Sequence, residues 1–164
     1  EKLAQIYQAV TGITTNARQF AITSYQQAIQ LDPSNPLLRI NLGGRYLEMQ
    51  NFDSAIEQFS LSTKLKPDYA NAYFNLAFAY QQRKNFLLAA FALKKTLLLV
   101  PAGSDDYNKT NKLLEDTKTY LTPEEINILN QDQNGSALQN NQNELPLFSE
   151  PTPTQTPSPT PSKP

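Results

Sequence analysis

The fold is decided by two successive stretches, PLLRINLGGRYLEMQNFDSAIEQFSLSTKLKP at residues 36–67 and ANAYFNLAFAYQQRKNFLLAAFALKKTLLLVP at residues 70–101. Each stretch ends in a proline, and Pro33, Pro67 and Pro101 stand 34 residues apart. A fixed period of this length indicates a repeat in which two helices form one unit. Such a unit cannot bury its apolar face alone, so neighbouring units must stack.

The register extends to residue types at equal offsets before each proline. Large residues flanked by small ones let paired helices interlock at the packing density of a protein interior. The prolines end the second helix of each unit, because the ring removes a backbone donor and clashes with the preceding turn. The recurring residues are an alanine (Ala21, Ala55, Ala89), a bulky apolar residue (Tyr25, Phe59, Leu93) and a small residue (Ala28, Ser62, Thr96).

The first helix of each unit carries its own apolar face. Leu42, Gly43 and Tyr46 follow the spacing of one helical face, and the next unit repeats the pattern with leucine, alanine and tyrosine. The small residue in each set predicts a close approach of the neighbouring helix. We expect turns between paired helices at residues 50–53 and 84–86, each with an apolar residue starting the next helix.

These repeats resemble the tetratricopeptide repeat (TPR) family over about residues 2–103. The resemblance implies an all-α fold, a right-handed α-solenoid of helix–turn–helix repeats with a C-terminal capping helix and a disordered Pro/Thr-rich tail. The predicted organisation is TPR repeat 1 at residues 1–35, repeat 2 at 36–69, repeat 3 at 70–103, a capping helix plus a short helix at 104–131, and the low-complexity tail at 132–164.

The first repeat departs most from the pattern. It keeps Tyr25 and Pro33, yet it has Gln8 and Gly12 where the other repeats have leucine and tyrosine. Its turn position carries Arg18 instead of phenylalanine. Terminal repeats are often atypical because one side faces solvent, so we expect a degenerate end repeat.

The chain beyond the third proline divides into a cap and a tail. Asp105-Asp106 favour a helix start, and the mixed polarity that follows predicts a solvating cap over the last repeat. Thr122-Pro123-Glu124-Glu125 forms a capping box and predicts a short helix through about Asn130. The proline, threonine and serine of residues 151–164 predict disorder. The apolar island Leu145–Phe148 could dock on the folded part.

The composition argues against chemistry in this chain. Histidine and cysteine are absent, and acidic pairs such as Asp105-Asp106 point in different directions on a helix. The sequence therefore predicts no enzyme, no catalytic residue, no metal site and no cofactor. Lysine and arginine number 14 against 15 acidic residues, without a basic cluster, so we expect no nucleic-acid partner.

The family resemblance implies that the outer face of each first helix lines a concave groove for an extended peptide or a partner helix. Asn41 and Asn75 stand 34 residues apart, and their amides either bond a peptide backbone or satisfy local groups. Phe74 and Phe78 either anchor a partner or pack against the adjacent repeat. The predicted groove residues are Tyr7, Ile40, Asn41, Gly44, Glu48, Asn71, Phe74, Asn75, Phe78 and Gln82.

One activity of the family is disfavoured by the residues themselves. Chaperone-binding members grip a C-terminal carboxylate with lysine and arginine at defined groove positions. The matching positions here are Ile6, Val10, Asn41, Asn71 and Asn75, of which only Asn41 fits. Because the cations are missing, the resemblance does not extend to a chaperone-tail clamp.

The predicted function is a protein–protein interaction scaffold. The alternative is the soluble C-terminal appendage of a bacterial membrane protein, such as an envelope polysaccharide (O-antigen-type) polymerase or ligase. The apolar run Phe86–Val100 contains Lys94-Lys95 and is too short to span a bilayer, although a span upstream of Glu1 is possible. Self-association through an apolar groove is a third possibility. The compartment stays open: cytoplasmic, or extracytoplasmic as part of a membrane-anchored protein.

Overall fold

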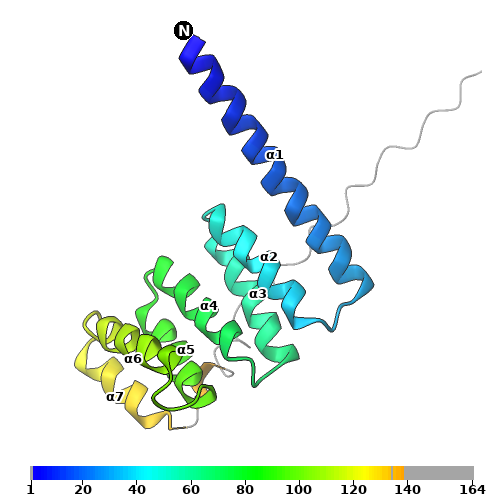
Figure 1. Cartoon of the computed structure of the whole chain (residues 1–164). Coiled ribbons are helices and arrows are strands. Elements are labelled where there is room, and N and C mark those ends of the chain that lie inside the picture. The colour runs from blue at the N-terminus through cyan, green and yellow to red at the C-terminus, as the bar shows by residue number, and fades with distance from the viewer. Residues whose placement is uncertain (1, 134, 139–164) are drawn as a thin grey trace, which may run out of the picture.

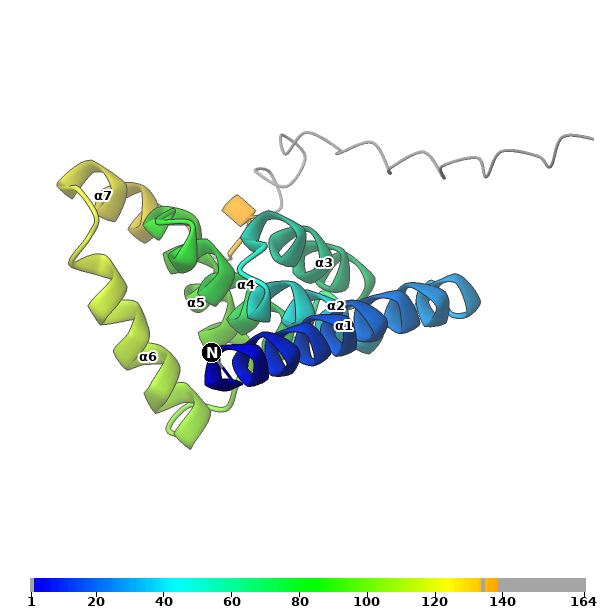
Figure 2. The same cartoon turned by 90° about the horizontal axis from the view of Figure 1, so that it is seen from above.

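The computed structural model describes the backbone of residues 2–133 and 135–138, and the side chains of these ranges from Ala17 onward. These ranges contain helices and no strand, which confirms the all-α prediction. In both views α7 lies at one end of the stack and the C-terminal end of α1 at the other (Figure 1, Figure 2). The helices are α1 (Lys2–Leu31), α2 (Pro36–Glu48), α3 (Phe52–Leu65), α4 (Ala70–Gln82), α5 (Phe86–Leu99), α6 (Asp105–Lys118) and α7 (Pro123–Gln131).

The register prolines follow the ends of helices as predicted, while the turns expected at residues 50–53 and 84–86 are shorter, because Phe52 and Phe86 already begin α3 and α5. Helices α1, α3 and α5 each end two residues before one of the three register prolines. Between paired helices, Gln50 and Lys84 adopt left-handed conformations with φ of 58° and 59°. The next residue caps the following helix: the Asn51 side chain accepts from the backbone N–H of Ser54 at 3.3 Å, and Asn85 does the same in the third repeat.

The helices pack in register order. α2 pairs with α3 and α4 with α5, while α4 packs on α3 and α6 on α5. The predicted close approach at Gly43 is confirmed, since a Cβ there would lie 2.6 Å from the ring of Phe59, which is fully buried. The main core runs from α2 to α7 through Phe59 and Leu76. A second, smaller cluster joins α1 to α2 through Ile22, Ile29 and Leu42.

The first repeat differs from the prediction. Residues 2–31 form one continuous helix, whereas two helices with a turn at Arg18 were expected for residues 1–35. Ala17 stands at the register position where Asn51 caps the next helix, and alanine has no side-chain acceptor. Arg18 likewise replaces the apolar residue that starts α3. Because nothing stops the helix, it continues, and its N-terminal half projects away from the other helices (Figure 1).

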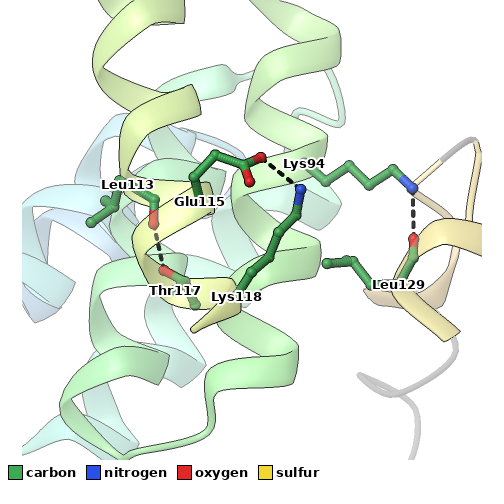
Figure 3. Close-up of polar contacts among 6 residues, drawn as sticks. All are labelled: Lys94, Leu113, Glu115, Thr117, Lys118 and Leu129. Carbon is green, nitrogen blue, oxygen red and sulfur yellow. Dashed lines mark hydrogen bonds and ion pairs between the residues drawn. The ribbon is translucent and has the colours of Figure 1, made fainter. Parts of the chain in front are cut away.

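The two predicted helices after the third proline are confirmed. Thr122 and Glu125 form the capping box: the Glu125 N–H donates to the Thr122 hydroxyl at 3.2 Å, and the Thr122 N–H donates to the Glu125 carboxylate at 2.8 Å. The ammonium of Lys94 in α5 donates to the carbonyl of Leu129 at 2.6 Å and links α7 to α5 (Figure 3). Leu129 is buried in the main core.

Residues 135–138, which were predicted to belong to the low-complexity tail at 132–164, pack on the folded part of the chain. Asp132 accepts hydrogen bonds from the Ser136 N–H and hydroxyl at 2.9 and 3.1 Å, and Leu138 is only 1% exposed in the main core. The segment packs because Leu138 and Ala137 supply apolar area that the surrounding polar residues lack. Residues 139–164, including the apolar island Leu145–Phe148, lie outside the described part of the chain. None of the described helices combines the length and apolarity needed to cross a membrane.

Candidate functional site

A cavity of about 550 Å³ opens where the start of α4, the end of α5 and the start of α6 meet. At the far end of α4, the Gln81 amide donates to the Thr117 hydroxyl at 2.7 Å and holds α4 to α6. That hydroxyl in turn donates to the Leu113 carbonyl at 2.6 Å (Figure 3). The cavity residues are Asp68, Tyr69, Ala70, Asn71, Phe74, Thr96, Val100, Asp106, Lys109 and Thr110.

The place equivalent to this cavity one repeat earlier, between α2 and α4, is filled by side chains. Ile40, Ala72 and Leu76 all lie in the main core cluster, and Ile40 is only 7% exposed. Ile40 was predicted to line the groove, but its side chain is not open to a ligand. The reason is that the next first helix, α4, brings a leucine and an alanine against this corner.

The cavity is open because two positions of the 34-residue register carry different residues from those of the preceding repeat. Phe74, Asp106 and Thr110 stand 34 residues after the isoleucine, alanine and leucine of the filled corner. Thr110 is smaller than leucine, and the charged carboxylate of Asp106 favours water over an apolar contact. Phe74 therefore stays half-buried and forms a wall of the cavity, packed on one side against the core.

Two predicted asparagines act as one polar unit beside Phe74. The Asn75 amide donates to the Asn71 backbone carbonyl at 2.8 Å and to the Asn71 side-chain oxygen at 3.0 Å. Asn75 thus satisfies local groups, the second of the two roles considered for it. Its carbonyl oxygen and the N–H groups of Asn71 are the amide atoms that this unit offers to a ligand, one an acceptor and the others donors.

None of the other predicted groove residues with a described side chain lines the cavity. Phe78 follows Phe74 by one helical turn and is 44% exposed. Glu48 forms an ion pair with Arg45 at 2.8 Å. A Cβ built on Gly44 would meet open space. Asn41 is half-buried and Gln82 is exposed, while the side chain of Tyr7 in α1 lies outside the described side chains.

Charged groups of both signs surround the cavity. Asp68 and Asp106 supply carboxylates and Lys109 an ammonium group. The ammonium of Lys66 lies 4.9 Å from the centre of the Tyr69 ring, a cation–π contact at the rim. Burial, with a smaller contribution from the Asp68 carboxylate, raises the pKa of Tyr73. In residues 2–133 and 135–138, no three acidic side chains gather as a metal ion requires.

The sequence reasoning missed the contribution of α6. It treated residues 104–131 as a solvating cap, whereas Asp106, Lys109 and Thr110 form one wall of the cavity. The signal was present in the 34-residue register, which continues from Asn75 to Lys109. Polar residues at these positions interrupt the apolar spacing, so the continuation of the repeat is not visible in the apolar pattern.

Comparisons with known proteins agree with this register. A family model described as TPR repeat matches residues 20–50 and 43–83. The chain is 33% identical over 79 residues to the chloroplastic tetratricopeptide repeat domain-containing protein PYG7 of Arabidopsis thaliana, which covers 48% of the chain and 26% of PYG7. It is 35% identical over 74 residues to human tetratricopeptide repeat protein 28, covering 44% of the chain and 3% of that protein. The chain thus spans about a quarter or less of these relatives.

A solved structure shares the fold. The first TPR of Spaghetti (RPAP3), bound to the HSP90 peptide SRMEEVD, superposes with a TM-score of 0.57 at 20% identity, covering 71% of this chain and 90% of that chain. Stacked helix pairs in a fixed register define the class of α-solenoid repeat proteins. Within that class, the family model and the matching register assign residues 20–83 of this chain to tetratricopeptide repeats.

Proposed function

We propose that this protein is an interaction module that binds an extended segment of another protein at the cavity between α4 and α6. The observation that carries the proposal is the cavity itself, about 550 Å³ with Phe74 as a wall and the Asn71–Asn75 unit beside it. Pockets of this size with apolar walls and a few polar groups are typical of ligand sites.

The chemistry of the cavity suits a peptide. An apolar side chain of the ligand would lie against Tyr69, Phe74 and Val100 and remove them from water. The Asn71–Asn75 unit would meet the backbone, which offers one donor and one acceptor per residue. Phe78, one turn further along α4, would contact the next apolar residue of the ligand.

The structural comparison supports peptide binding as the mode. The RPAP3 domain of similar fold was solved with a bound HSP90 peptide. Here the rim carries Asp68 and Asp106 as well as Lys109, so its charge is mixed. We therefore propose an apolar side chain as the anchor, without a requirement for an acidic terminus.

The test is a selection of phage-displayed random peptides on the full chain, followed by affinity measurements for the enriched peptides. We expect Asn71→Ala/Phe74→Ala to weaken binding at least about tenfold, because truncating a central aromatic anchor removes much of the binding energy. The matched control, Leu98→Ala/Ile128→Ala, also truncates two side chains but changes exposed apolar residues that do not line the cavity.

Each result of the peptide-binding experiment has its own interpretation. Loss of binding in the cavity variant alone, with its circular dichroism signal retained, supports the site. Equal binding by both variants places peptide recognition on another surface. Asn41→Ala/Asn75→Ala reports whether the two register asparagines act together, since Asn41 lies on α2, outside the cavity.

A further inference from the structure

The most unusual element of the molecule is the N-terminal half of α1. The C-terminal half of α1 packs on α2 through Ile22, Tyr25 and Ile29. The preceding residues continue the same helix away from the other helices (Figure 1). At the junction, Phe20 is 75% exposed.

The sequence of this half gives a lone helix little support. Residues 11–15 read TGITT, and glycine and β-branched residues are among the weaker helix formers. The whole of α1 contains no acidic residue, and its charges are Lys2 and Arg18, so it has no ion pairs between successive turns. Helices in proteins owe most of their stability to packing of an apolar face, and this half needs a surface to pack against.

The spacing of apolar residues indicates what that surface is. They recur at alternating intervals of three and four, which is the heptad pattern of helices that pair along one face. By the same spacing, Ile22, Tyr25 and Ile29 fall on a different face of the helix, so the contact with α2 does not use the heptad face. The two heptad residues whose side chains are described, Ala17 and Phe20, are exposed. The heptad positions are Leu3, Ile6, Val10, Ile13, Ala17 and Phe20.

We propose that the heptad face of α1 pairs with the same face of a second copy of this chain. The positions that flank a heptad face normally select a partner through charge, and here Lys2 is the one charged residue among them. The flanking positions are Lys2, Tyr7, Ala9, Thr14, Asn16 and Ala21. A single lysine at the end of the helix leaves the rest of the face without charge that would oppose the pairing of identical helices or direct the face to an oppositely charged partner. The interface uses α1 alone, so the cavity between α4 and α6 stays open in the assembly.

The experiment compares the mass in solution of the full chain and two charge-matched variants by sedimentation over a hundredfold range of concentration. Val10→Glu/Ile13→Glu places carboxylates on the heptad face. Gln8→Glu/Thr15→Glu adds the same charge at the positions opposite that face. We expect the native chain and the Gln8/Thr15 variant to reach at least twice the 18.4 kDa of one chain, and the Val10/Ile13 variant to remain at 18.4 kDa.

A second measurement keeps the interpretation independent of folding. The helical circular dichroism signal of the native chain should rise with concentration, while that of the Val10/Ile13 variant should stay constant at a lower value. A native chain that remains a single copy at every concentration overturns the proposal, as does equal association by both variants. Binding of a single-copy chain to phosphatidylcholine–phosphatidylglycerol vesicles would also overturn it and assign the heptad face to lipid.

Discussion

Two adjacent glycines in α2, Gly43 and Gly44, lie in different surroundings. Gly43 faces α3, where a Cβ would lie between 2.6 and 2.9 Å from three atoms of the Phe59 ring. Gly44 faces open space on the outer side of α2. The ring of Phe59 is fully buried and cannot move aside without disturbing its neighbours, so only the first glycine is required by packing.

Substituting alanine at Gly43 and at Gly44 should change the free energy of unfolding in opposite directions. Gly43→Ala should lower the free energy of unfolding by about 1 to 3 kcal/mol, because it overpacks the core around Phe59. Gly44→Ala should raise it by up to about 1 kcal/mol, because alanine is the better helix former and meets no neighbour. Urea unfolding of the two variants and the native chain measures both changes. Equal effects at the two positions would contradict the packing argument.

A comparison of Ile40 with Phe74 shows how much of the site could be predicted from the sequence. The register placed Ile40 and Phe74 at equivalent positions, and both were predicted to line the groove. Ile40 is buried and Phe74 forms a cavity wall, because Leu76 follows one and Thr110 the other. Spacing along one helix assigns a residue to a face, but the exposure of that face depends on side chains one repeat later. For Phe74 those side chains belong to α6, which was interpreted as a cap.

At the scale of elements, the boundaries were predictable wherever a local stop signal exists. Proline, a left-handed residue and an asparagine cap end and start the helices of the second and third repeats. The first repeat lacks the cap and the apolar residue after it, and its two expected helices merge into α1. The departure from the repeat pattern at Arg18 was visible in the sequence. A degenerate turn and the absence of a turn give the same residue pattern, so the sequence did not distinguish them.

The segment after α7 behaves as a packed element rather than as the start of a tail. Leu138→Ala should lower the free energy of unfolding by about 2 kcal/mol or more, because it removes a buried side chain from the core. Ile128→Ala is the matched control, since Ile128 is half-exposed on α7. Thermal unfolding of both variants measures the difference. If Leu138→Ala costs no more than the control, residues 135–138 do not contribute to the core.

At the scale of the whole molecule, the two ends of the solenoid differ. At one end, α7 and Leu138 cover the last helix pair, and Leu129 and Leu138 are both buried. At the other end, α1 covers α2 with only half of its length. A stack of repeats needs both terminal faces covered, and the uncovered half of α1 is the part we assign to a second copy.

Buried and half-buried tyrosines along the stack make the stability of the fold fall at alkaline pH. Burial raises the pKa of Tyr46 and Tyr73, and it raises the pKa of Tyr80 from 10.0 to about 12. Below pH 10 these hydroxyls are protonated in the folded and the unfolded chain, and their contribution is complete. Between pH 10 and about 12 the unfolded chain loses its proton first, so the free energy of unfolding falls as pH rises.

The contribution of Tyr80 to this fall should be about 2 to 3 kcal/mol, given its shift and its burial in the core. Tyr80→Phe keeps the ring and removes the ionisable hydroxyl, so its unfolding free energy should fall less steeply above pH 10 than that of the native chain. Tyr120→Phe is the control, because Tyr120 is exposed and stacks on Phe86 through its ring alone. Urea unfolding at a series of alkaline pH values gives the slopes. Parallel slopes for the native chain and Tyr80→Phe would show that the buried hydroxyl does not govern alkaline unfolding.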